Sequence, residues 1–229
     1  MIGTGSMSDP YIPAEKELRL TRRCLEIIER HNFGVTVHTK SDLLLRDLEL
    51  LERINRTSKA VVQMTLTTAD DGLCKILEPG VCPTSRRVEV LCECRKLGIP
   101  TVVWLSPLLP FINDTEENLD GIVDFCVRAG VKAIICFGIG LTLREGNREY
   151  FYACLEKAAA RDGRFSGMKG RYMRTFGLSY EVTSPDGQRL MARLSQACRK
   201  SGMMLGTDSI FAWMADFPEN PLQPDLFGF

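Results

Sequence analysis

Residues 101–137, TVVWLSPLLPFINDTEENLDGIVDFCVRAGVKAIICF, hold the pattern that decides the fold. Two short runs rich in β-branched residues, Thr101–Ser106 and Val131–Phe137, predict β-strands. Between these runs, Glu116–Ala129 has the apolar spacing of an amphipathic helix, and Gly130 after it is a typical helix stop. The segment therefore predicts one complete strand–helix–strand unit.

The same alternation continues toward the amino terminus, where Val35–Thr39 and Ala60–Thr68 are further β-rich runs. The strand starts lie roughly 25 to 40 residues apart, which is typical of repeated βα units with a parallel sheet. The predicted helices are Ala14–His31, Asp42–Asn55 and Arg86–Leu97, with start signals at Ser41 and at Asp114 with Glu117, and a stop signal at Gly98. The sequence therefore predicts an α/β fold.

The first predicted strand is unusually short. Met1 to Gly5 reads as the last residues of a strand that runs into a glycine loop. A strand usually has about five or six residues, and here only two to four remain. Five strands in all cannot close an eight-stranded barrel. We therefore expect a partial (β/α) barrel of parallel strands with a frayed first edge, either open or lacking a unit upstream.

The carboxyl-terminal third has a weaker pattern. Ser184–Ser201, opened by Ser184-Pro185, predicts an amphipathic helix, whereas Arg164–Gly177 is basic and predicts irregular structure. We expect a barrel core over residues 1–160, a helical extension over 161–217 and a mobile tail over 218–229. A local basic run can contact nucleic acid or simply be solvated; it comprises Arg161, Arg164, Lys169, Arg171 and Arg174.

Composition narrows the class of protein. The chain has 229 residues, with 29 Lys+Arg against 29 Asp+Glu, so no excess of positive charge attracts nucleic acid or an anionic membrane. Ala133–Leu141 is too short to span a bilayer, Thr101–Ile112 is broken by prolines, and the N-terminus has no secretory-signal pattern. The nine cysteines are scattered and odd in number. They indicate reduced thiols in a cytoplasmic protein.

Polar residues follow the first two strands, where a parallel sheet places its functional loops. Ser8 and Asp9 lie in the loop GSMSDPY after the first strand. Their hydroxyl and carboxylate can hold an ammonium or hydroxyl group of a ligand, or can cap backbone amides. Lys40 follows the second strand and can bind a carboxylate or phosphate, or remain solvated.

The third strand end offers hydroxyls and a later arginine. Thr65 and Thr67 share one face of the strand and can bind a ribose or a carboxylate, although threonine is also a good strand former. Arg87 can grip a ligand carboxylate or pair with Glu78. The loop Ser106–Pro110 is stiffened by two prolines, which suits a pocket wall or an ordinary ordered loop.

Four segments taken together resemble the radical S-adenosylmethionine (radical SAM) superfamily, and within it the spore photoproduct lyase-like proteins. These segments are GSMSDPYIPAEKELRLTRRCLEII, VHTKSDLLLRDLELLERIN, MTLTTADDGLCKILEPG and LSPLLPFINDTEENLDGIV. The resemblance covers roughly Ile2 to Glu156, and YEVTSPDGQRL resembles the tail of the same branch.

The resemblance implies a partial (β/α)6 barrel with a [4Fe-4S] cluster and S-adenosylmethionine at its carboxyl-end mouth. In that family the reduced cluster cleaves S-adenosylmethionine to a 5′-deoxyadenosyl radical. By resemblance, Ser8 and Asp9 contact the methionine amino group and Lys40 meets the methionine carboxylate. Thr65 places a hydroxyl near the cofactor, and Arg87 matches an arginine of the family pattern. A nucleic-acid substrate follows only by analogy with the branch.

The chain departs from the family pattern at the cluster. The family holds its cluster with a CxxxCxxC motif, which this chain lacks; its cysteines are 24, 74, 82, 92, 94, 126, 136, 154 and 198. Cys92 and Cys94 are two apart on a predicted helix and point to nearly opposite sides. We expect no metal ligands here, a truncated gene product or mis-set start, and no radical chemistry by this chain alone.

Other classes of function remain open. The chain can be a non-catalytic module that retains S-adenosylmethionine binding. It can also be an interaction protein, since Gln223, Leu226 and Phe227 resemble the QxxLF peptide that docks on bacterial sliding clamps. A third alternative is a complete barrel enzyme that uses His38, Asp9 or Glu78 for acid–base chemistry, although nothing in the sequence pairs them.

Overall fold

The computed structural model describes residues 1–216 and contains a five-stranded parallel sheet in the order β1-β2-β3-β4-β5. The strands are β1 (Ile2–Thr4), β2 (Val35–Thr39), β3 (Ala60–Thr65), β4 (Thr101–Trp104) and β5 (Ala133–Ile135). Neighbouring strands are consecutive in the chain, as in a (β/α) barrel. The predicted α/β fold, with a parallel sheet forming a partial barrel, is confirmed.

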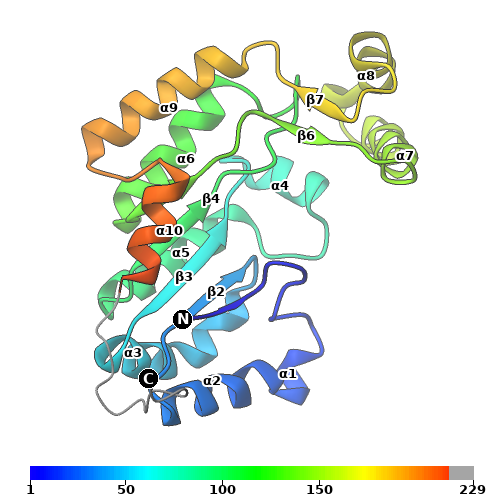
Figure 1. Cartoon of the computed structure of the whole chain (residues 1–229). Coiled ribbons are helices and arrows are strands. Elements are labelled where there is room, and N and C mark those ends of the chain that lie inside the picture. Colours follow the sequence, from blue (N-terminus) through cyan, green and yellow to red (C-terminus); the bar gives the residue numbers. More distant parts are fainter. Residues whose placement is uncertain (217–229) are drawn as a thin grey trace, which may run out of the picture.

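Helices cover one face of the sheet (Figure 1). Their apolar sides pack on the alternate strand residues that include Val37, Val62 and Val103, which are fully buried. The helices of this layer are α2 (Leu20–Arg30), α3 (Leu48–Thr57), α5 (Thr84–Lys96), α6 (Glu116–Ala129) and α9 (Gly187–Ser201). This layer holds the main hydrophobic core.

The opposite face of the sheet is covered near the amino ends of the strands. Here α10 (Thr207–Ala215) packs Ile210 and Met214 on Val61, Val102 and Ile135 (Figure 1). Just before α10, Met204 forms a single parallel bridge with Ala133. The bridge extends the sheet beyond β5 by one residue, in the place of a sixth strand.

Residues 140–183 form a separate insertion between β5 and α9. It contains β6 (Gly140–Thr142), α7 (Asn147–Ala159), a 3-10 turn (Gly163–Phe165), α8 (Met168–Phe176) and β7 (Glu181–Thr183). Strands β6 and β7 pair antiparallel, and α7 and α8 share a small core around Leu155, Phe165 and Tyr172. This core contains residues on both sides of position 160. Figure 1 shows the insertion beyond the carboxyl ends of the main strands.

The first strand is short, as predicted. β1 has three residues and lies at the edge of the sheet, and no strand of residues 1–216 pairs with its outer side. On α2, Arg22 and Glu29 face α3 through ion pairs, and Leu25 and Ile28 face the core. Ile27, on the remaining flank, is 54% exposed.

Three local expectations were wrong. The helix expected over Ala14–His31 breaks into α1 (Glu15–Leu18) and α2, because Arg19 adopts a left-handed backbone with φ of 50°. The helix expected from Asp42 starts as a 3-10 turn (Asp42–Asp47) before α3. The segment expected to be irregular contains α8, which Tyr172 anchors in the insertion core.

The cap predicted at Asp114 also differs. Thr115 caps α6 by accepting from the Asn118 amide, while Asp114 accepts instead from the Ser184 hydroxyl at 2.5 Å. The cap predicted at Ser41 is confirmed, since its hydroxyl accepts from the Leu43 amide. A serine or threonine at the next position competes equally well for the cap, so the pattern alone did not decide.

Within residues 1–216, no helix has the length and apolarity needed to cross a membrane. The tail predicted over 218–229 and its clamp-like residues Gln223, Leu226 and Phe227 lie outside the described residues.

Candidate functional site

The loop after β1 is fastened to the end of β2. Gly5 has φ of 93°, and a Cβ there would lie 2.0 Å from the His38 carbonyl oxygen, so only glycine fits this approach. The Asp9 carboxylate accepts hydrogen bonds from the Thr39 hydroxyl at 2.7 Å and the Lys40 amide at 2.8 Å. It also accepts from the Tyr11 amide at 2.9 Å. Asp9 therefore holds the two strand ends together.

Ser8 lies next to this anchor and is exposed. The contacts to backbone amides that the sequence offered as an alternative for this loop are made by Asp9, which accepts from the Tyr11 and Lys40 amides. The assignment of both residues to a cofactor stays a prediction.

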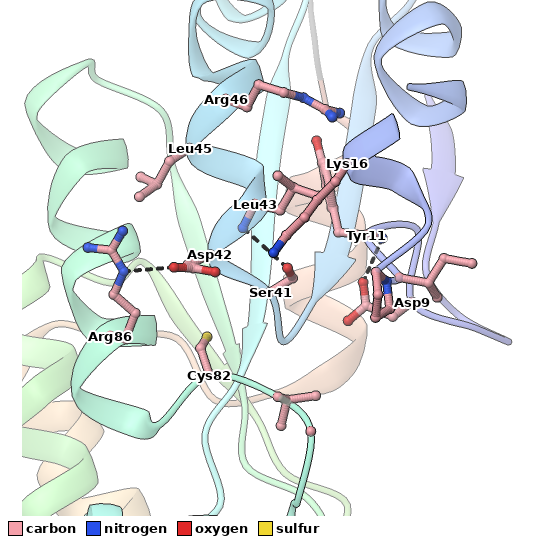
Figure 2. Close-up of a pocket in the computed structure, with 14 residues that line it drawn as sticks. Asp9, Tyr11, Lys16, Ser41, Asp42, Leu43, Leu45, Arg46, Cys82 and Arg86 are labelled. Carbon is pink, nitrogen blue, oxygen red and sulfur yellow. Dashed lines mark hydrogen bonds and ion pairs between the residues drawn. The ribbon is translucent and has the colours of Figure 1, made fainter. Parts of the chain in front are cut away.

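A buried network of charges supports this loop. Figure 2 shows two of its members, Tyr11 and Arg46, beside a cavity of about 490 Å³. Asp47 is fully buried in the 3-10 turn and accepts from the Tyr11 hydroxyl at 3.1 Å. Its carboxylate also binds Arg22 at 2.9 Å and Arg46 at 2.8 Å. One carboxylate thus joins the β1 loop, the 3-10 turn and α2.

Glu15 is the second buried acid of the network. Its carboxylate accepts from Arg46 at 2.9 Å and from the Leu20 and Thr21 amides at 2.8 and 3.1 Å, so it caps the start of α2. Burial acts to raise the pKa of Glu15, but the hydrogen bonds from Arg46 and from the α2 amides outweigh it and lower the pKa below 4.5. Both acids are therefore ionised at neutral pH.

Three charged side chains meet at the carboxyl end of β2 and β3. Arg87, at the start of α5, is fully buried and donates to Glu78 at 2.8 Å. It also donates to the Thr65 carbonyl at 3.0 Å and to the Cys82 carbonyl at 2.9 Å. The pairing of Arg87 with Glu78 that the sequence offered as an alternative is confirmed. Arg87 thus ties α5 to the end of β3.

Lys40 completes this charge triad, which we define as Lys40, Glu78 and Arg87. The Lys40 ammonium pairs with the other side of the Glu78 carboxylate, and its side chain is 35% exposed. Two cations share one carboxylate, so the triad carries a formal charge of +1. Burial acts to raise the pKa of Glu78, but Lys40 and Arg87 outweigh it and lower the pKa below 4.5. An anion that approaches Lys40 would therefore meet a net positive site.

The Glu78 pairing predicts a pH dependence of stability. Because the folded-state pKa lies below 4.5, ionised Glu78 contributes stability that is complete above pH 4.5. That contribution is lost as the pH falls through the lowered folded value. We expect Glu78→Gln to be less stable than the parent protein at pH 7, and the difference to shrink at pH 3.5. Urea unfolding at both pH values measures it; an equal difference at both would contradict the assignment.

The two predicted threonines take different positions. The Thr65 hydroxyl lies 2.9 Å from Nε2 of His38, whose ring stacks on Trp104 with centroids 4.8 Å apart. Burial, aided by Lys40 and opposed by Asp9, lowers the pKa of His38. Thr67 lies further on, and its carbonyl accepts from Asn113 at 2.8 Å. His38, one of the three acid–base candidates, therefore has the Thr65 hydroxyl as its side-chain partner.

A cavity of about 550 Å³ opens at the carboxyl ends of the strands. Of the six predicted site residues, Lys40 and Thr67 line this cavity together with Glu78. Asp9 lines the other cavity, and Thr65 and Arg87 lie behind the wall in contact with protein groups. The structure therefore brings the triad and Thr67 to one place, and the roles of all six toward a cofactor stay predictions.

Sequence reasoning missed the Tyr11, Glu15 and Asp47 network. A signal was present, because Asp47 lies three residues after Leu44 and four before Leu51, both fully buried. An acid at core spacing in a helical pattern indicates a buried carboxylate that needs a cationic partner.

An iron–sulfur cluster does not fit the residues of 1–216. No group of three His, Cys, Asp or Glu side chains could hold a metal ion in this part of the chain. Burial raises the pKa of the Cys94 thiol to about 12 and that of Cys198 to about 11, so these thiols are not available as thiolates at neutral pH. The structure therefore supports no step through a cluster held by these residues.

No family model matches the chain. An uncharacterized protein of Methanocaldococcus jannaschii is 33% identical over 111 residues, which are 48% of this chain and 41% of the relative. An uncharacterized protein of Mycobacterium tuberculosis (strain H37Rv) is 27% identical over 157 residues, 69% of this chain and 46% of the relative. The chain spans about half the length of the curated relatives it matches.

Two solved structures are similar in part. One is Streptococcus suis SuiB bound to S-adenosylmethionine, with 18% identity and a TM-score of 0.40 over 49% of this chain and 25% of that chain. The other is a domain of pyruvate-formate lyase-activating enzyme from Bacteroides vulgatus, with 12% identity and a TM-score of 0.49 over 81% and 89%.

Proposed function

We propose that this chain is the S-adenosylmethionine-binding part of a radical SAM protein of the spore photoproduct lyase-like branch. The observation that carries the proposal is the charge triad, because it places a partly exposed ammonium, within a triad of formal charge +1, at the mouth of a parallel sheet. The resemblance of the four strand-end segments supports it, since they predict a carboxylate contact at Lys40. A nucleic-acid substrate is suggested only by the resemblance to this branch.

The residues present fit the amino-acid end of S-adenosylmethionine. Glu78 and Arg87 fix the position of Lys40 without neutralising the site, so the Lys40 ammonium can bind a ligand carboxylate. Asp9 holds the β1 loop against the Lys40 amide and so keeps the β2 end in place. When bound, S-adenosylmethionine supplies a sulfonium whose carbon–sulfur bond can be cleaved reductively. Because no cluster fits residues 1–216, we assign no cleavage to this chain alone.

Replacing Lys40 tests the proposal. We expect Lys40→Met to weaken S-adenosylmethionine binding about tenfold or more, because a charged hydrogen bond contributes roughly 1.5–3 kcal/mol. Isothermal titration calorimetry with the purified full chain measures it. The matched control is Lys96→Met, since Lys96 is an exposed lysine of α5 paired with Glu93 away from the cavity.

A matched ligand gives a second test. Decarboxylated S-adenosylmethionine keeps the sulfonium nucleoside and lacks the carboxylate. It should bind the parent protein about tenfold more weakly than S-adenosylmethionine does, and should bind Lys40→Met and the parent protein equally. Unchanged binding of S-adenosylmethionine by Lys40→Met would refute the proposed contact.

A further inference from the structure

The cavity at the strand ends has two chemically different parts. Lys40, Glu78 and Thr67 lie at its polar end. Most of the remaining wall is formed by apolar side chains of α4 (Asp71–Leu77), the loop after β4, β6 and α7, and Asn113, Tyr150 and Cys154 are its polar members. We call this second part the α7 compartment and define it by Leu77, Leu141, Phe151, Leu155, Ala158 and Phe165.

The α7 compartment lies where the insertion meets the main fold. The sheet and its helices have the main core, and a second core contains Leu155, Ala158 and Phe165 of the insertion together with Leu73 of α4. The insertion is further held by Arg148, which donates to the Leu143 and Leu178 carbonyls at 2.8 Å. The compartment is therefore bounded by α4 and the loop after β4 on the side of the main fold and by β6 and α7 on the side of the insertion.

The wall chemistry defines the ligand. Lys40 and Glu78 are the charged side chains of the cavity lining, and they pair with each other at its polar end. The amide of Asn113 is engaged with the Leu109 amide and the Thr67 carbonyl. The six side chains that define the α7 compartment therefore offer apolar and aromatic contact and carry no hydrogen-bonding group, whereas Tyr150 and Cys154 elsewhere in the same lining carry a hydroxyl and a thiol. A polar group placed there would lose its water without compensation, whereas an apolar ring would not.

We propose that the α7 compartment binds the apolar, ring-containing part of a small-molecule substrate, next to the ligand at Lys40. The volume of the cavity, about 550 Å³, lies within the range of roughly 300–1,000 Å³ that is usual for pockets that bind drug-sized ligands. The proposal depends on the proposed function only in naming the bound molecule a substrate. The binding of an apolar ring depends on the compartment alone.

The test uses N-phenyl-1-naphthylamine, a neutral apolar probe that becomes fluorescent in apolar sites. The full chain should bind it saturably. Ala158 is buried on the inner side of α7, whereas Ala153 is exposed on the same helix. Ala158→Trp should fill the compartment and weaken probe binding about tenfold or more, and the matched control Ala153→Trp should change it less than about twofold.

A second measurement needs no variant. Cys154 lines the cavity, and Cys24 is exposed on α2 outside it. Saturating probe should slow the alkylation of Cys154 by N-ethylmaleimide about tenfold and leave that of Cys24 unchanged, as read by peptide mass spectrometry. Absence of probe binding by the parent protein, or alkylation of Cys154 that the probe does not slow, would overturn the proposal.

The two proposals can fail separately. If Lys40→Met retains probe binding and the parent protein fails to bind S-adenosylmethionine, the compartment stands and the proposed function falls. If the parent protein binds S-adenosylmethionine but no probe, the compartment falls and the proposed function stands.

Discussion

Replacing Asp47 by alanine should lower the free energy of unfolding by about 3–5 kcal/mol, the range for breaking a buried ion pair from one side. Asp47 is fully buried, while Arg22 and Arg46 are each about three-quarters buried and depend on it as an acceptor. Burial acts to raise the pKa of Asp47, but hydrogen bonds from both arginines lower it, so the carboxylate is ionised at neutral pH. Its removal also leaves the Tyr11 hydroxyl without its partner.

The matched control for Asp47→Ala is Glu29→Ala. Glu29 on α2 pairs with Arg53 on α3, but these side chains are 30% and 46% exposed, whereas Asp47 is fully buried. Exposed pairs contribute roughly 0–1 kcal/mol, so this variant should stay near the parent protein. Urea unfolding at pH 7 compares the two. A loss for Asp47→Ala no larger than that for Glu29→Ala would show that the network does not stabilise the β1 loop.

Replacing Arg87 by methionine should cost a similar amount, about 3–5 kcal/mol, through a different cause. The guanidinium serves Glu78 and two backbone carbonyls at once, those of Thr65 and Cys82. Methionine fills much of the volume but donates no hydrogen bond, so three buried or partly buried acceptors lose a donor. Glu78 then retains Lys40 as its cationic partner.

Two comparisons separate charge from geometry at Arg87. Arg87→Lys keeps the charge but offers a point donor instead of a planar fork, so its loss should be intermediate. The deficit of Arg87→Met should shrink as the pH falls toward 4, because the burial that raises the pKa of Glu78 is then less opposed and the carboxyl takes up a proton. A deficit of Arg87→Met that is independent of pH would show that Glu78 is not the group left unpaired.

The parallel sheet could be predicted because each strand has a recognisable pattern within a few consecutive residues. Val35–Thr39 was predicted to the residue, as was the helix Glu116–Ala129, since β-branched runs and apolar helical spacing are properties of short segments. The break at Arg19 could not be predicted in this way. It depends on Glu15 capping a new helix with Arg46 behind it, and Arg46 lies 31 residues away in the chain.

The candidate site was predictable to the level of strand ends. Lys40 and Thr67 were chosen because parallel strands bring their carboxyl ends together, and both line one cavity. Burial decided which of the other candidate residues a ligand can reach. Arg87 looked available to a ligand in the sequence, yet packing places it at zero exposure with its donors on protein groups. The α7 compartment had no sequence signal, because its walls come from segments separated by up to about 90 residues.

The two chain segments that connect the insertion to the main fold lie side by side. Where the insertion leaves and re-enters the main fold, the Ser184 amide donates to the Ile139 carbonyl at 2.9 Å, and Gly140 lies opposite Thr183. A different segment could be transplanted between these two residues if its own ends met at the same spacing. Recombination of genes at these two positions would replace the insertion beyond the carboxyl ends of the strands. The parallel sheet, its helices and the charge triad would stay unchanged.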